Sequence, residues 1–305
     1  MSESGSQLKR YSIIGVVAVL AALFSATLAS GQAPAPVTRF TTRFTAVTAP
    51  ANQVELVQLV SEFAPGAAVA FHSHGGPEFV TVIEGELTFR ESGKAGVVVK
   101  AGETMTQLPS QVMDVSNTGS VRARTAVAFL LPAGAALTTL QSGIFAAPLG
   151  PKLLARTSSQ VTVSAASFDV VQLVFDFAPG AFGAVHKHGG PGQATVFEGT
   201  ITKRQGTQVT AYPAGQGFPE VTDVVLSVGN LGTTPASMAV AFLLPAGAVL
   251  TTPVTGAAPG APATGNTGSV QGEAWTSPAA LLGLALLGIT LLGGAAAVSA
   301  RRSHR

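Results

Sequence analysis

The chain has 305 residues, a formal net charge of +2 and no cysteine; hydrophobic residues make up 47% of it and charged residues only 10%. The absence of cysteine excludes disulfides, thiolate zinc sites, iron–sulfur clusters and cysteine nucleophiles. The 17 Lys and Arg residues are scattered along the chain, so no basic stripe indicates nucleic-acid binding.

Residues 1–31 have the layout of a secretory signal peptide. Lys9 and Arg10 form a positive segment, residues 11–29 are an uncharged apolar run, and small residues follow the run. This order is typical of an export signal that is cleaved after the small residues. The run is also long enough to remain as an uncleaved anchor, so both outcomes stay open.

The body of the chain is an internal repeat. The segment that begins FAPGA at Phe63 returns at Phe177, and the block AVAFLLPAGA also occurs twice. The repeat places one domain at residues 37–147 and a second at residues 148–255. Each copy consists of short segments rich in Val, Phe and Thr between Gly and Pro turns, which predicts an all-β sandwich or barrel.

The first copy carries two histidines and a glutamate in a frame of glycines. Gly66 is followed by His72, His74, Glu78 and Gly85. Alternate side chains of a strand share a face, so the histidines should point the same way, and the Gly-Gly-Pro turn after them can return the glutamate to the same place. Two imidazoles and a carboxylate suit iron(II), manganese(II) or a similar divalent ion and leave coordination positions open. The alternative is a pair of half-buried histidines with no ligand.

This spacing resembles the first motif of the cupin superfamily, G-x5-H-x-H-x3-4-E-x6-G. The second cupin motif is matched only at its ends, by Gly102 and Asn117, and Met113 stands where the family has a fourth ligand, a histidine. The resemblance covers both copies and implies a bicupin, two tandem cupin jelly-roll β-barrels. It also implies that the two histidines and the glutamate hold a divalent metal ion, with Mn, Fe, Cu, Ni and Zn all open.

The second copy keeps only part of the same motif. His186 and His188 match the histidine pair, but Gly192 stands at the carboxylate position and Leu226 at that of the fourth ligand. Two histidines alone hold a metal weakly. A second metal site at this pair and a degenerate copy kept for its fold therefore both stay open.

The C-terminal end indicates attachment to a membrane. Residues 256–275 are rich in Pro, Gly, Ala and Thr, which predicts a flexible linker, and residues 276–300 are apolar, uncharged and long enough for a transmembrane helix. The tail, residues 301–305, holds three arginines and marks the cytoplasmic side. The segment APATG at residues 261–265 resembles the cell-wall sorting signal L-P-x-T-G with alanine in place of leucine. Sortase attachment and a plain membrane anchor both stay open, and the body is expected outside the cytoplasm.

Two classes of function stay open for the body. Bicupins include oxalate decarboxylases and flavonol-type dioxygenases, so the resemblance implies an enzyme in which the metal activates a small organic substrate. The missing fourth histidine and the scarcity of polar candidates for acid–base chemistry weigh against it. The alternative is a non-catalytic surface protein that binds a small molecule or has a structural role. The expected partners are the membrane, a small-molecule ligand and a sortase, but no nucleic acid.

Overall fold

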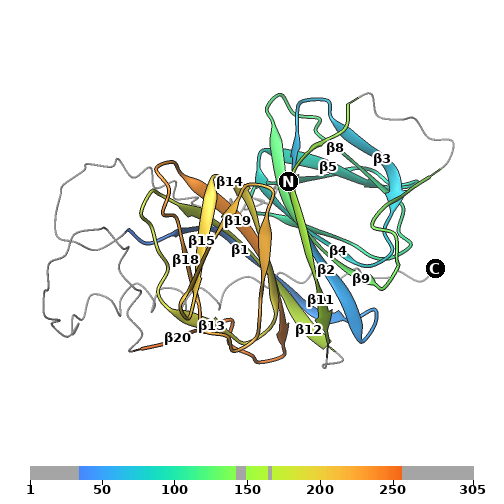
Figure 1. Ribbon diagram of the computed structural model, residues 1–305. Helices are drawn as coiled ribbons and strands as arrows, with labels where there is room; N and C mark the ends of the chain where they lie inside the picture. Colours follow the sequence, from blue (N-terminus) through green and yellow to red (C-terminus); the bar gives the residue numbers. More distant parts are fainter. Residues whose placement is uncertain (1–33, 142–148, 164–166, 256–305) are drawn as a thin grey trace, which may run out of the picture. The chain divides into compact units, whose positions relative to one another are not determined.

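The structure is a computed structural model that describes residues 34–141, 149–163 and 167–255 (Figure 1). Every regular element in these ranges is a strand, which confirms the predicted all-β class. The expected signal helix, linker, transmembrane helix and basic tail lie outside the described residues. Within the described ranges, no helix is long and apolar enough to cross a membrane.

Two five-stranded sheets form the first barrel. In spatial order, the first sheet contains β11 (Lys152–Thr162), β2 (Gln53–Phe63), β9 (Ala123–Pro132), β4 (Glu78–Glu84) and β7 (Thr104–Gln107). The second sheet contains β10 (Thr139–Leu140), β3 (Ala68–Ser73), β8 (Met113–Ser116), β5 (Glu86–Glu91) and β6 (Val97–Lys100).

The second barrel repeats this arrangement, with its second wall divided into two smaller sheets. Its five-stranded sheet contains β1 (Val37–Thr48), β12 (Ser167–Phe177), β19 (Ala236–Pro245), β14 (Gly192–Glu198) and β17 (Gly217–Glu220). The other wall contains the pair β13 (His186–His188) and β20 (Thr251–Pro253), and the three strands β16 (Gln208–Pro213), β15 (Thr200–Gln205) and β18 (Ser227–Gly229).

The two copies exchange their first strands. Strand β1, from the first copy, pairs with β12 of the second along a register that runs from Val37↔Asp176 to Thr48↔Ser167. Strand β11, at the start of the second copy, pairs with β2 of the first. Each barrel therefore contains one strand that the sequence repeat assigns to the other copy, and the two barrels are joined by backbone hydrogen bonds.

The five-stranded sheets are apolar on both faces because each face is buried. On β2, Val57 packs inside the first barrel, whereas its neighbour Leu56 packs with Phe168 and Leu243 of the second copy. A sheet that is covered on both faces is expected to have nearly continuous apolar strands instead of strict alternation. The run AVAFLLP, present in β9 and β19, has this character and lies at the centre of each sheet.

A buried asparagine closes the same turn in each barrel. Asn117 donates to the carbonyl oxygens of Phe63 (2.9 Å) and Val121 (2.8 Å), and its side-chain oxygen accepts from the Gly119 N–H (3.0 Å). Asn230 makes the corresponding three hydrogen bonds in the second barrel. Both turns have the sequence N-x-G, and the asparagines tie each turn to the end of β2 or β12.

We expect Asn117→Ala and Asn230→Ala each to lower the free energy of unfolding by about 2 kcal/mol, because each leaves buried backbone groups without partners. Chemical denaturation of the variants measures the loss. Thr118→Ala is the matched control, since its hydroxyl hydrogen bond to Thr88 is exposed and should change stability by less than about 0.5 kcal/mol. Equal effects of Asn117→Ala and Thr118→Ala would contradict this assignment.

Candidate metal site

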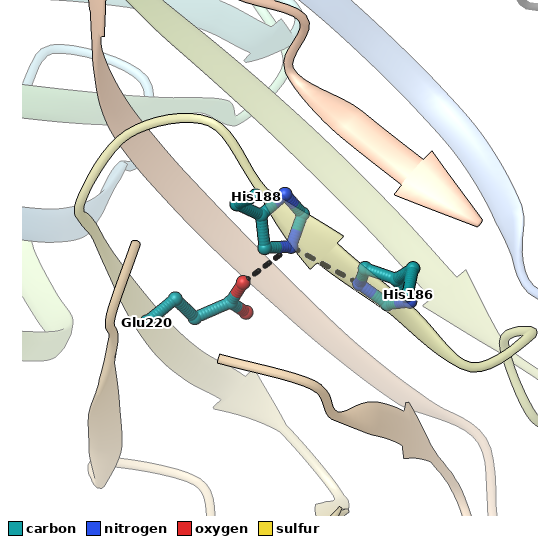
Figure 2. A group of neighbouring side chains, drawn as sticks. All are labelled: His186, His188 and Glu220. Carbon is teal, nitrogen blue, oxygen red and sulfur yellow. Dashed lines mark hydrogen bonds and ion pairs between the residues drawn. The ribbon is translucent and has the colours of Figure 1, made fainter. Parts of the chain in front are cut away.

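The histidine pair of the second barrel lies with a glutamate that the sequence motif does not contain (Figure 2). His186 and His188 come from β13, and Glu220 comes from the end of β17. One ligand atom of each residue lies within 4.8 Å of those of the other two. Among the described residues, this is the one group of three or more His, Cys, Asp or Glu side chains that meets this distance.

The backbone partners of the two rings fix their tautomers. Nδ1 of His186 lies 2.7 Å from the carbonyl oxygen of Ala184, and Nδ1 of His188 lies 2.9 Å from that of Leu250. A carbonyl oxygen only accepts, so each Nδ1 carries a hydrogen and each Nε2 of a neutral ring carries a lone pair. The two Nε2 atoms nevertheless lie 3.0 Å apart. Two lone pairs at this distance repel each other unless a cation lies beside them.

Glu220 adds a third electron-pair donor at the same place. Its Oε2 lies 2.7 Å from Nε2 of His188, and this oxygen is buried with no hydrogen-bond partner among the described residues. Burial also lowers the pKa of His186, which disfavours a proton on that ring. A divalent metal ion would satisfy all three donors, and backbone carbonyls that hold Nδ1 are common partners of metal-bound histidines. The residues therefore fit the predicted divalent metal cofactor.

The carboxylate of the second barrel comes from β17, the strand beside the one that carries the motif position. Gly192 on β14 stands where the motif has its glutamate, and Glu220 is its direct partner across the β14–β17 ladder. In the first barrel the corresponding pair is Glu78 on β4 opposite Gln107 on β7. The acidic residue of the pair is therefore on β4 in the first barrel and on β17 in the second, and its cross-strand partner is neutral in both.

The Phe242 ring lies against the motif position of the second barrel, Gly192. A Cβ on Gly192 would lie only 2.5 Å from the Phe242 ring, which packs against His188 with centroids 4.3 Å apart. A larger residue at Gly192 therefore requires this ring to move, since the equivalent ring of Phe129 leaves room for Glu78 opposite it in the first barrel. In the second barrel Glu220 supplies the carboxylate from β17.

The first barrel has the same histidine arrangement with a less converged carboxylate. Nδ1 of His72 contacts the carbonyl oxygen of Ala70 at 2.8 Å, and Nδ1 of His74 contacts that of Leu137 at 2.5 Å. Nε2 of His74 is buried without a hydrogen-bond partner, and Oε2 of Glu78 lies 3.6 Å from it. The Gly-Gly-Pro turn therefore brings the glutamate back to His74, although the three residues do not meet the 4.8 Å grouping found in the second barrel.

Burial changes the protonation of the first-barrel residues. It raises the pKa of Glu78 to about 8 and lowers the pKa of His74 to about 4. It also lowers the pKa of His72. At neutral pH, without a metal, these shifts favour an uncharged carboxylic acid beside uncharged imidazoles. A metal ion entering this site would have to displace the Glu78 proton.

The positions of the family's fourth ligand hold core side chains in both barrels. Met113 is buried and stands opposite His72 in the β3–β8 ladder. Leu226 is buried and forms an isolated bridge with His186. Neither position supplies a nitrogen or oxygen donor, so each site offers at most two imidazoles and one carboxylate from the residues named above.

Residues 59–129 match the family model of the cupin domain, Cupin_2. This match supports the predicted cupin superfamily. No curated protein sequence matches the chain.

Solved structures of similar fold share 12% sequence identity with the chain. Oxalate decarboxylase from Bacillus subtilis covers 66% of this chain and 76% of its own, with a TM-score of 0.44. AerE from Microcystis aeruginosa covers 68% and 99% with a TM-score of 0.42, and salicylate 1,2-dioxygenase from Pseudaminobacter salicylatoxidans covers 61% and 70% with a TM-score of 0.37. At this identity the likeness concerns the fold alone.

Both histidine pairs and Glu78 follow from the sequence motif, whereas Glu220 does not. The repeat does contain a clue to Glu220, because this residue and Gln107 occupy corresponding positions in the two copies and only Glu220 is acidic. Recognising it requires the strand register, which shows that Glu220 faces Gly192.

Proposed function

We propose that the chain is a metal-binding bicupin whose principal site is the second barrel, with His186, His188 and Glu220 as protein ligands. The observation that carries the proposal is the convergence of two imidazole Nε2 atoms and one buried carboxylate oxygen. When bound, a divalent ion supplies Lewis-acid polarisation and, for Fe or Mn, a redox centre.

The first barrel is proposed as a second and weaker site, formed by His72, His74 and Glu78. Its histidines are oriented by the same kind of backbone contacts, but its carboxyl group favours the protonated state. Metal binding there releases a proton, so its affinity falls as the pH is lowered. The two barrels therefore differ in affinity although the histidine motif is the same.

The substrate or ligand is proposed to be a small organic molecule bound outside the cytoplasm. The export-signal pattern in residues 1–31 and the apolar segment with its basic tail in residues 276–305 support this location. Decarboxylase- or dioxygenase-like chemistry is the enzymatic form of the proposal, since three protein ligands leave metal positions open. Binding of the ligand without turnover is the second form, favoured by the apolar fourth-ligand positions Met113 and Leu226.

Elemental analysis of the purified full-length chain tests the metal proposal. We expect about one tightly held divalent ion per chain, which should be lost in His188→Ala and retained in His74→Ala. The wild type should take up a second ion only at higher metal concentration. His74→Ala should remove only this second ion. A folded protein that takes up no divalent ion, or one whose tight ion survives His188→Ala, would refute the proposal.

A further inference from the structure

The interiors of the two barrels differ by one charged residue. On β5 of the first barrel, Phe89 faces inward, is buried and belongs to the hydrophobic core. On β15 of the second barrel, the corresponding position holds Lys203. The sequence Thr-Phe-Arg at residues 88–90 of the first copy is Thr-Lys-Arg at residues 202–204 of the second. The cross-strand partner is equivalent in both cases, Val115 for Phe89 and Val228 for Lys203. The backbone therefore presents both side chains to the same region of their barrels.

Lys203 lies toward the candidate metal site. Its Nζ lies 5.0 Å from the centre of the Phe218 ring, and Phe218 is two residues before Glu220 on β17, so both side chains share one face. Its ladder partner on β18, Val228, is two residues after Leu226, which bridges to His186. Leu226 and β18 thus lie between the lysine and His186, and Phe218 lies between the lysine and Glu220 along β17.

The ammonium group has no anionic partner of its own. Among the described residues, no carboxylate oxygen lies within 4.0 Å of Lys203, and the side chain is half-buried. Burial lowers the pKa of Lys203, and Glu220 acts in the opposite direction. A cation in a position filled by phenylalanine in the other barrel is costly unless an anion compensates it. Contact with an aromatic face compensates only part of the cost.

The charges of the site favour an anion once a metal is bound. A divalent ion with neutral histidines and one carboxylate leaves a net charge of about +1, and Lys203 raises this to about +2. An ammonium has three donors and one positive charge, so it can donate to the oxygen atoms of a carboxylate. A small organic acid with two oxygen-bearing groups would compensate both charges.

We propose that Lys203 is the anion-binding residue of the second barrel and that the ligand of this barrel is a small organic acid. This inference rests on the proposed metal site and adds the chemical class of its ligand. The first barrel, with Phe89 at the same position, should not share this preference.

The test uses the full-length chain loaded with Co²⁺, whose visible absorption reports both metal binding and ligand binding. Malonate, its neutral analogue malonamide and inorganic phosphate are titrated against the wild type and three variants. Lys203→Met removes the charge at similar length, Lys203→Arg keeps it, and Arg204→Met is the matched control. Arg204 is the next residue on the strand and packs over Phe182.

We expect Lys203→Met to weaken malonate binding by about tenfold or more, the effect of losing a charge-assisted hydrogen bond. Cobalt affinity should stay within about twofold, and Lys203→Arg and Arg204→Met should bind malonate like the wild type. Equal malonate affinity in the wild type and Lys203→Met, with cobalt bound, would overturn the lysine assignment and leave the metal site intact. Tighter binding of phosphate than of malonate, or of malonamide equal to malonate, would overturn the ligand class.

If the wild type binds no cobalt, the proposed metal site fails and the lysine is judged separately. Calorimetric titration of the metal-free wild type and Lys203→Met with malonate then decides. Binding that depends on Lys203 supports the anion site without a metal, and the absence of such binding overturns it.

Discussion

Replacing Glu220 by glutamine is expected to weaken the tightest divalent-metal site by about 100-fold, since even outer partners of metal ligands contribute 10- to 100-fold. Glutamine has the same shape but lacks the negative charge, and it is the residue that the first barrel already has at this position, Gln107. The fold should therefore tolerate the change. Calorimetric titration with Mn²⁺ or Zn²⁺ measures the loss, and thermal unfolding of the metal-free protein verifies that stability is retained.

A second variant examines why the carboxylate occupies β17 instead of β14. Adding Gly192→Glu to Glu220→Gln restores the motif of the first barrel, but the Phe242 ring would have to move to admit the new side chain. We expect no recovery of metal affinity and a loss of stability of about 2–3 kcal/mol from overpacking. Full recovery in this double variant would show that Phe242 does not exclude a carboxylate from Gly192. Unchanged metal affinity in Glu220→Gln alone would remove Glu220 from the site.

The sequence was sufficient for the all-β class because its signals are local. Short apolar segments between Gly and Pro turns predict strands wherever they occur, and the duplication of FAPGA and LLPAGA shows two units of the same fold. The H-x-H pairs are also local, since alternate residues of one strand share a face. Both histidine pairs consequently project together, as expected, with ring centroids 4.7 Å apart in each barrel.

The features that escaped prediction depend on contacts between distant segments. Glu220 follows His188 by 32 positions, and only the pairing of β14 with β17 places it opposite Gly192. The exchange of β1 and β11 is equally invisible in the repeat, because either copy offers an apolar strand edge to accept them. Lys203 resembles a surface lysine in sequence, and its inward position follows only from the β15–β18 register.

Metal-free protein is expected to lose about 2 kcal/mol of stability between pH 6.5 and pH 8 through Glu78, because one pKa unit corresponds to about 1.4 kcal/mol. Burial raises the pKa of Glu78 to about 8 from its ordinary value of 4.5, so between these values the folded state binds more protons than the unfolded state. Its contribution is fully present below pH 4.5 and is lost as the pH rises through 8.

The histidines act in the opposite direction and at lower pH. Burial lowers the pKa of His74 to about 4, so between pH 4 and 6.5 the unfolded state binds more protons and stability rises with pH. The lowered pKa values of His72 and His186 add to this rise. Glu78 and the histidines oppose each other below pH 6.5, and above it the decline due to Glu78 remains.

Glu78→Gln isolates this effect because glutamine resembles the protonated acid in shape and cannot ionise. With chelator present, urea unfolding of the variant should show a nearly flat stability between pH 6.5 and 8, while the wild type declines. The variant should accordingly be the more stable protein at pH 8. If both proteins declined in parallel, Glu78 would not titrate between pH 6.5 and 8, and the decline would come from other groups.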